Sequence, residues 1–197
     1  NEFAYNVDQD SGVTIISIRG TNNGRNVLSD LDFRPFYDKK LGVDIHRGFR
    51  DAAEKIREEI IENHALEETV ILTGHSLGGA IATVCASRLE KDVEELYTYG
   101  SPRVGGDVFR DNLLVDHCRV VNNNDMVTKV PFWFIGYRHH GYLTYINHYG
   151  NIRELTSWQK LKDQIRGRWC ALRKFQMFDG IRDHDINKYC KKLKSLV

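Results

Sequence analysis

The sequence predicts an α/β fold in which a mostly parallel central sheet has helices on both faces. Three observations support this fold class. Stretches with strand and helix patterns alternate along the chain. Residues 70–72 are continuously apolar, as expected for a strand that is covered on both faces. Residues 50–62 place Ala53, Ile56 and Ile60 on one helical face, which indicates an amphipathic helix against the sheet.

The expected elements follow one another in a regular order. The first strand is expected at residues 13–18, and the helix at 50–62 precedes a second strand at 70–73. A helix of small and apolar residues follows over 77–89. The remaining expected elements are a strand at 96–99, a short helix over 104–114, a strand at 119–122, a hairpin pair at 143–146 and 151–155, and two or three closing helices. One domain over residues 1–197 accommodates all of them.

The composition excludes several classes of protein. A net charge of +1 gives no reason to expect nucleic acid as a partner. No apolar run approaches the roughly eighteen residues that a transmembrane segment needs, so we expect none. The chain begins at Asn1 without methionine, from which we expect processing or a missing end. The sequence does not decide between a secreted and a cytoplasmic protein.

The cysteines do not form a recognisable metal or disulfide framework. The four are Cys85, Cys118, Cys170 and Cys190, and their spacing matches no short metal-binding pattern. Cys85 is expected as a buried free thiol on the helix at 77–89, whereas pairing of Cys170 with Cys190 stays open. We expect neither a metal nor an organic cofactor.

The most informative motif is Gly74-His75-Ser76-Leu77-Gly78, which places a serine between two glycines. It directly follows an apolar strand and directly precedes a helix. A tight turn of this kind, a nucleophile elbow, holds the serine hydroxyl clear of the backbone for attack. It also makes the Leu77 N–H one donor of an oxyanion hole. The alternative is an ordinary strand-to-helix joint in which Ser76 caps the helix.

A nucleophilic serine also needs a histidine base and a carboxylate that orients the base. On this architecture the chain order is serine, acid, histidine. Asp125 fits the acid because it follows the strand at 119–122, although an aspartate in an asparagine-rich loop also forms Asx turns. Spacing alone does not choose the histidine. The candidates downstream of Ser76 are His117, His139, His140, His148 and His184.

Five segments together carry a resemblance to a known family. They are Ile18-Arg19-Gly20-Thr21, residues 43–49 around His46-Arg47-Gly48-Phe49, residues 73–82, Tyr99-Gly100-Ser101-Pro102-Arg103-Val104-Gly105, and residues 121–131 around Asn124-Asp125-Met126-Val127. In these segments the chain resembles the class 3 lipases, α/β-hydrolases that include the secreted fungal triacylglycerol lipases. The resemblance implies Asp125 as the triad acid, His184 as the base and His148 as a non-catalytic histidine. It also implies Thr21 as the second oxyanion donor.

The resemblance places a lid over residues 22–36, where apolar and charged side chains are mixed. An amphipathic lid covers an apolar acyl groove in water and uncovers it at an oil surface. The apolar residues of this segment are Val27, Leu28, Leu31, Phe33 and Phe36. The alternative is a short helix that stays packed on the core. Residues 131–135 form a second apolar stretch, which we expect to start in the core and to end, at Phe134 and Ile135, in the acyl pocket.

These features predict a serine carboxylic ester hydrolase that acts on lipid esters through an acyl-enzyme intermediate. Its partners would be a lipid or small ester substrate and, transiently, a lipid interface. The region before the strand at 13–18 is nearly absent compared with the fungal lipases, and the lid is short. Both departures favour phospholipid, galactolipid, monoacylglycerol or short-chain esters. The alternatives are a feruloyl-type or short-chain esterase, a phospholipase A1 or galactolipase, and a hydrolase-like binding module without turnover.

Overall fold

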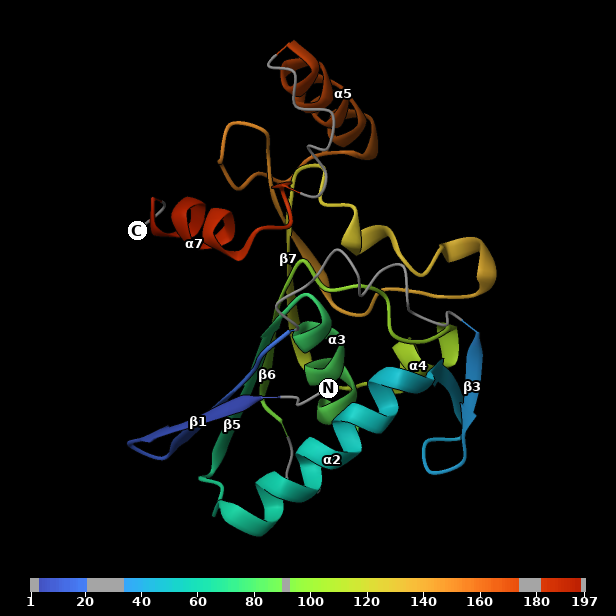
Figure 1. The fold of residues 1–197 in the computed structure, drawn as a ribbon, viewed down its shortest axis with the longest axis vertical. Coiled ribbons are helices and arrows are strands. Elements are labelled where there is room, and N and C mark those ends of the chain that lie inside the picture. The colour runs from blue at the N-terminus through green and yellow to red at the C-terminus, as the bar shows by residue number, and fades with distance from the viewer. Residues whose placement is uncertain (1–3, 21–33, 90–92, 174–181, 196–197) are drawn as a thin grey trace.

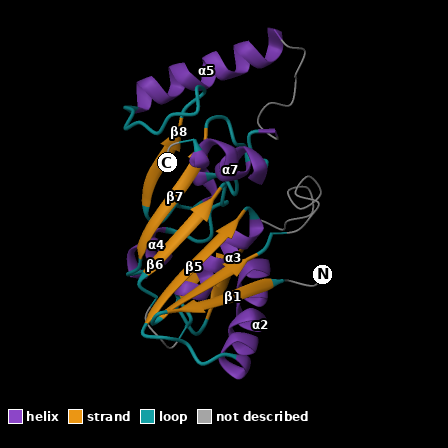
Figure 2. Ribbon diagram, turned by 90° about the vertical axis from the view of Figure 1, so that its left-hand side faces the viewer, coloured by secondary structure: helices purple, strands orange, loops and turns teal. Residues whose placement is uncertain are grey.

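The computed structural model describes residues 4–20, 34–89, 93–173 and 182–195. Its centre is a six-stranded sheet with the spatial order β1-β2-β5-β6-β7-β8 (Figure 2). The strands are β1 (Tyr5–Asp10), β2 (Val13–Ile18), β5 (Thr69–His75), β6 (Glu95–Tyr99), β7 (Asp116–Asn122) and β8 (Tyr142–Ile146). Only β1 and β2 pair antiparallel, and the other four neighbouring pairs are parallel. The predicted α/β-hydrolase architecture, with its mostly parallel sheet, is therefore confirmed.

Helices α2 (Arg47–Asn63) and α3 (Leu77–Ala86) pack against each other and cover one face of the sheet (Figure 1). All residues of α3 up to Cys85 are buried, because the small residues at its start allow a close approach to the strands. On the opposite face, α7 (Ile186–Lys194) packs Tyr189 against the β7–β8 end. Helix α5 (Ser157–Arg173) lies at the end of the molecule opposite α2.

The predicted elements recur with shifted ends, and local contacts explain the shifts. The helix predicted to reach residue 89 ends at Ala86, because the Ser87 hydroxyl and N–H both bond to the Val84 carbonyl and close the last turn. The helix predicted over 104–114 is restricted to α4 (Asp107–Asn112). Its first residues are extended instead, since the Val104 carbonyl accepts a hydrogen bond from His46 N–H.

Two short pieces of β structure were not predicted and one predicted strand is missing. β1 and the hairpin of β3 (Pro35–Asp38) with β4 (Val43–His46) escaped prediction because their outward-facing residues are polar or exposed. The predicted strand at 151–155 is wrong. Within the described residues this segment forms one bridge, Ile146 to Ile152. The Asn147 side-chain oxygen accepts from the N–H groups of Tyr149 and Asn151, so a compact turn replaces an extended hairpin.

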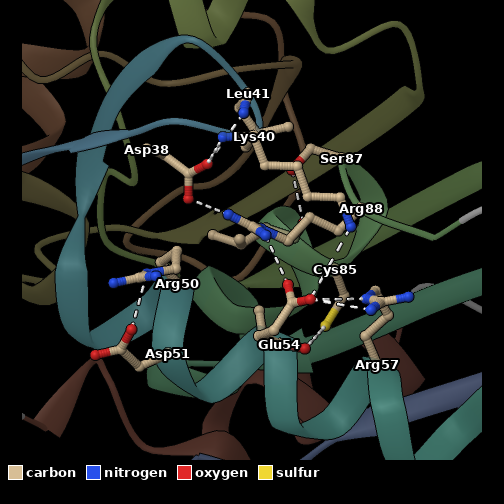
Figure 3. A network of polar contacts seen from close by, with 12 residues as sticks. Asp38, Lys40, Leu41, Arg50, Asp51, Glu54, Arg57, Cys85, Ser87 and Arg88 are labelled. Carbon is tan, nitrogen blue, oxygen red and sulfur yellow. Dashed lines mark hydrogen bonds and ion pairs between the residues drawn. The ribbon is translucent and has the colours of Figure 1, made fainter.

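A buried ion-pair network fastens the β3–β4 hairpin to the helices (Figure 3). The Arg88 guanidinium, which follows α3, bonds to Asp38 of β3 and to Glu54 of α2, the latter at 2.6 Å. Arg57 bonds to the other oxygen of Glu54 at 2.9 Å. The side chains of Asp38 and Arg88 are each only 3% exposed. Their charges therefore compensate each other in a site that water hardly reaches.

The lid and the apolar stretch at 131–135 have different outcomes. Most of the predicted lid lies outside the described residues, and its last two residues, Pro35 and Phe36, belong to β3. Pro131, at the start of the apolar stretch, is buried as expected. Residues 133–135 form a 3₁₀ turn with Phe132, Trp133 and Phe134 exposed, so the core does not extend beyond Pro131. Among the described side chains, Cys85, Cys118 and Cys190 are free thiols. The side chain of Cys170 lies outside the described part of the chain.

Candidate active site

The candidate site begins at the joint between β5 and α3. Ser76 follows β5 directly and has φ 58° and ψ −129°, a strained conformation that lifts its side chain out of the strand. The joint is tight because a Cβ on Gly78 would collide with the backbone carbonyl of Ile18 on β2. Glycine at this position therefore lets α3 start directly against the first parallel strand. These are the features that the nucleophile elbow predicts.

The structure places Ser76, His184 and Asp125 in one hydrogen-bonded chain. The Ser76 hydroxyl lies 2.7 Å from His184 Nε2, and His184 Nδ1 lies 2.9 Å from Asp125 Oδ2. The carboxylate can only accept, so Nδ1 carries the imidazole proton and Nε2 is the acceptor for the serine hydroxyl. Gly100, with φ +59°, leaves room for this contact, because a Cβ there would lie 2.6 Å from Asp125 Oδ2.

The other four candidate histidines lie elsewhere and have other partners. His117 Nδ1 and His140 Nδ1 lie 3.0 Å apart, and His139 Nε2 lies 2.8 Å from the Thr128 carbonyl. His148 is held through its backbone N–H, which donates to Asp163 at 2.9 Å. Only His184 among the five reaches Ser76 within the described residues.

Asp125 lies in the loop after β7 and is completely buried. Besides His184, it accepts from the Tyr189 hydroxyl at 2.6 Å and from the Val127 N–H at 2.9 Å. Burial, reinforced by Asp125, raises the pKa of Tyr189 well above its usual value, which keeps this hydroxyl a neutral donor. The same hydroxyl accepts from the Asn122 N–H at 3.0 Å. Tyr189 thus connects α7, β7 and the carboxylate.

The segment that carries His184 is held by its neighbours on both sides of that residue. The Asp183 carbonyl accepts from the Asn122 side chain at 2.8 Å, and its carboxylate forms an ion pair with Lys188 at 3.1 Å. His75 donates from Nε2 to the His184 carbonyl at 2.8 Å, and the two rings are stacked. Burial, together with the nearby His184, lowers the pKa of His75 to about 4. His75 is therefore neutral at pH 7 and adds no charge beside the base.

The two predicted oxyanion donors have different outcomes. Leu77 is the first residue of α3, where backbone N–H groups lack partners within the helix and are available to a ligand. Thr21 lies outside the described residues. The preceding residue, Gly20, packs closely against the turn at Ser76, because a Cβ on Gly20 would lie 2.8 Å from the His75 carbonyl oxygen and 3.4 Å from Ser76 Cβ.

The predicted substrate-contacting residues are also divided. Val27, Leu28, Leu31 and Phe33 lie outside the described residues. Phe134 and Ile135 are 66% and 40% exposed on the 3₁₀ turn that follows the acid loop. Their role in substrate binding stays a prediction.

Sequence reasoning missed three residues that support this site. Tyr189 had a usable signal, because it follows His184 by five residues and is the one aromatic residue on an otherwise lysine-rich helix. His75 is the variable position of the glycine-serine motif, and Asn122 ends the strand that precedes Asp125. The basic helix α7 contributes in addition Lys192, which donates to Asn122 Oδ1 at 2.6 Å.

Among the described residues, no group of three or more His, Cys, Asp or Glu side chains is arranged to hold a metal ion. None of the described helices combines the length and the apolar character needed to cross a membrane.

Known proteins are similar to this chain over more than half of its length. The sequence profile of the family described as Lipase (class 3) matches residues 15–135. A secreted mono- and diacylglycerol lipase of Fusarium solani is 38% identical over 137 residues, which cover 64% of this chain and 41% of the relative. The triacylglyceride lipase structure from Rhizomucor miehei is 28% identical with a TM-score of 0.62, covering 73% of this chain and 62% of that one.

A further similar structure is of a triacylglycerol lipase whose catalytic centre is described as formed by a serine protease triad. It is 31% identical with a TM-score of 0.60 and covers 68% of this chain and 57% of that chain. The chain spans about two fifths of the length of the Fusarium solani relative. The similarity therefore concerns the part that contains the elbow and the acid loop.

Proposed function

Because the chain belongs to the class 3 lipase family, we propose that it hydrolyses carboxylic esters of lipids through an acyl-enzyme intermediate. The observation that carries the proposal is the hydrogen-bonded chain from the Ser76 hydroxyl through His184 to Asp125, with distances of 2.7 and 2.9 Å. A serine, an imidazole in this tautomer and a buried carboxylate are the groups that acyl transfer requires. The related triacylglycerol lipase with its serine protease triad supports the same assignment.

In the first half of the reaction Ser76 Oγ attacks the ester carbonyl carbon while its proton moves to His184 Nε2. Asp125 stabilises the resulting imidazolium and keeps it aligned. The negative charge that develops on the carbonyl oxygen is stabilised by the Leu77 N–H and by Thr21 as the second donor, each worth about 3 to 4 kcal/mol. Collapse of this intermediate breaks the ester bond, and His184 returns its proton to the leaving alcohol.

In the second half a water molecule replaces the alcohol. His184 takes a proton from the water, which attacks the acyl carbon, and then gives that proton to Ser76 Oγ as the carboxylic acid leaves. His75 is neutral and therefore does not oppose protonation of His184 in either half of the reaction. A positive charge stacked on His184 would disfavour the imidazolium.

We assign lipid esters as the substrate class, with residues 22–36 as a lid and Phe134 and Ile135 at the acyl site. The related proteins are a mono- and diacylglycerol lipase and a triacylglyceride lipase, which supports glycerolipids as the first substrates to test. Transient contact with a lipid interface belongs to the same proposal, because a lid opens when its apolar face exchanges water for lipid.

The direct test is replacement of Ser76 by alanine, with Ser87→Ala as the matched control. Ser87 follows the same helix, and its hydroxyl bonds only to the Val84 carbonyl among the described residues. We expect Ser76→Ala to lower kcat for p-nitrophenyl esters by about 10⁶-fold and to abolish labelling by a fluorophosphonate. Ser87→Ala should retain both. Labelling that persists in Ser76→Ala would locate the nucleophile elsewhere.

A substrate panel separates lipid esters from the alternatives. p-Nitrophenyl esters of increasing acyl length, feruloyl esters, and emulsions of monoacylglycerol, phospholipid and triacylglycerol should be compared on the same preparation. Rates that rise at the onset of an emulsion phase support the lipid assignment. Hydrolysis of feruloyl or acetyl esters alone would contradict it, and a labelled but inactive Ser76 would indicate a binding module.

A further inference from the structure

Helix α5 presents a row of large apolar side chains to solvent. Trp158, Leu161, Ile165 and Trp169 are 63%, 45%, 57% and 59% exposed. Their spacing of three, four and four residues puts them on one side of the helix, where they form a continuous stripe. The helix lies at one end of the molecule (Figure 1), and all four side chains are exposed there. We call these four residues the α5 stripe.

The opposite side of α5 contacts β8, the turn after it, and Asn123 and Asn124 of the loop that contains Asp125. Asp163 is buried and accepts from the Tyr145 hydroxyl and from the His148 N–H, both at 2.9 Å. The Gln164 carbonyl accepts from the Asn124 side chain at 3.1 Å. A Cβ on Gly167 would lie 2.5 Å from the Asn123 side chain, so the helix backbone touches this loop. Anything that holds the α5 stripe is therefore connected to the residues next to Asp125.

The charges of α5 are mostly positive. The helix contains five basic residues and one acidic residue, so it carries four of the positive charges in a chain whose net charge is only +1. The single acid, Asp163, is buried in the contacts with β8 and the following turn. At 3.6 residues per turn, Lys162 and Arg168 lie on either side of the α5 stripe. An apolar stripe with a basic border is typical of helices that lie in a membrane interface.

A cavity of about 350 Å³ opens beside the helix, and its lining is also basic. It includes Arg153 of the preceding loop, Lys162 and Arg166 of α5, and the Tyr149 ring, over which the Arg166 guanidinium lies at 5.9 Å. The one carboxylate in the lining is the hydrogen-bonded Asp163. Three basic side chains around a solvent-open space favour an anionic group such as a phosphate.

We propose that α5 docks the protein on the surface of an anionic phospholipid bilayer. The α5 stripe lies among the acyl chains near the head groups, the two tryptophans lie at the interface, and Arg153, Lys162 and Arg166 bind lipid phosphates. A second copy of the chain fits this surface less well, because an isologous contact would bring the basic borders of two stripes together. The proposal does not depend on the ester-hydrolase function, since docking requires no turnover.

The test is vesicle binding by the full chain with Ser76→Ala, which keeps the lipids intact. We expect binding to vesicles of phosphatidylcholine with about 30% phosphatidylglycerol to be at least about tenfold tighter than binding to phosphatidylcholine alone. It should also weaken as salt rises from roughly 0.1 to 0.5 M. Both Trp158→Ala/Trp169→Ala and Lys162→Glu/Arg166→Glu should lower it about tenfold or more.

Two matched variants serve as controls. Trp133→Ala removes an equally exposed tryptophan from the 3₁₀ turn at 133–135, and Lys39→Glu/Lys55→Glu reverses two exposed charges near the opposite end. We expect both to bind anionic vesicles within about twofold of the parent, since neither changes α5. Thermal unfolding of each variant verifies that it is folded.

Fluorescence gives an independent measurement. The chain has three tryptophans, so Trp133→Phe leaves only Trp158 and Trp169 to report. Anionic vesicles should shift their emission to the blue and protect them from iodide. No binding, equal binding to both lipid mixtures, or loss of binding in Trp133→Ala with retention in Trp158→Ala/Trp169→Ala would each overturn the proposal. A dimer that dissociates only in the α5 variants, without vesicle binding, would assign the stripe to a second copy.

Discussion

Two of the buried aspartates, Asp38 and Asp125, are compensated in different ways. Asp38 is 2% exposed and bonds to the Arg88 guanidinium, a permanent cation that also binds Glu54 (Figure 3). Asp125 is fully buried, but the donors that reach it are His184, the Tyr189 hydroxyl and the Val127 N–H, none of which is a permanent cation. The first carboxylate is neutralised at all times. The second receives a positive partner only when His184 takes up a proton.

This difference separates stability from catalysis. Loss of Arg88 would leave the buried Asp38 carboxylate without its counter-ion and would lower the free energy of unfolding. Loss of the Asp125 charge would raise the energy of the transition state of the proposed reaction, in which the imidazolium forms. Four substitutions test this difference between the two carboxylates.

The largest effect is expected for Asp125→Asn. The amide presents a donor or acceptor of nearly the same shape, so the fold should persist, but it does not fix the His184 tautomer or stabilise the imidazolium. We expect kcat for a p-nitrophenyl ester to fall about 10⁴-fold while the melting temperature changes little. A kcat within tenfold of the parent would remove Asp125 from the proposed mechanism.

Arg88→Met should have the opposite profile. It leaves Asp38 without its counter-ion in a site that water hardly reaches, so we expect a loss of about 3–5 kcal/mol in the free energy of unfolding by urea. kcat of the folded fraction should stay within about twofold, because the network lies away from the triad. As a control, Arg57→Met removes the ion pair of Glu54 that lies nearer to solvent and should cost less than about 1 kcal/mol.

Tyr189→Phe probes the neutral compensation of Asp125. It removes one hydrogen bond to the carboxylate and leaves the Asn122 N–H without its acceptor. We expect the free energy of unfolding to fall by about 1.5–3 kcal/mol, since the lost bond involves a charged group. The less compensated carboxylate favours His184 protonation, so the acidic limb of the kcat/KM profile should move to higher pH. A loss of stability with an unchanged pH profile would restrict Tyr189 to a packing role.

His75→Gln gives the smallest effect, which depends on pH. In the folded chain the pKa of His75 is about 4, below the usual value near 6.5. The unfolded chain therefore binds a proton first as the pH falls from 6.5 to 4, and stability is lost in this window. Glutamine keeps a donor for the His184 carbonyl but has no such proton. The difference in unfolding free energy between pH 7 and pH 4 should shrink by roughly 1–2 kcal/mol in the variant.

Urea midpoints at pH 7, 5.5 and 4 measure this change. The His75→Gln variant retains other buried histidines with lowered pKa values, such as His117 with a pKa of about 3. Part of the acid sensitivity should therefore remain in the variant. An unchanged difference between pH 7 and pH 4 would mean that His75 does not titrate as the geometry indicates.

How far the fold could be predicted depended on burial. Strands β5 and β6 and helices α2 and α3 were predicted within a few residues, because their apolar side chains all contribute to the main core. The β3–β4 hairpin was not, since its strands have four residues each and expose side chains such as Tyr37 at 59%. The segment at 151–155 is mostly exposed, so the sequence pattern that predicted a strand there does not correspond to buried apolar residues.

The candidate site was only partly predictable for a related reason. The elbow is a local pattern of five residues, and local sequence identifies it. His184 lies 108 residues from Ser76, and no local signal chose it among five histidines; the resemblance did. Tyr189, His75 and Asn122 act through contacts between segments that are distant in the chain.

This distance also determines when the site can form during folding. The main core is built from residues 16 to 113, with elbow, strands and helices close in sequence, whereas His184 and Tyr189 arrive on a terminal segment. Closing such long loops is entropically costly until the core exists to receive them. We therefore expect the proposed site to form after this core, when the segment that carries His184 and Tyr189 packs against it.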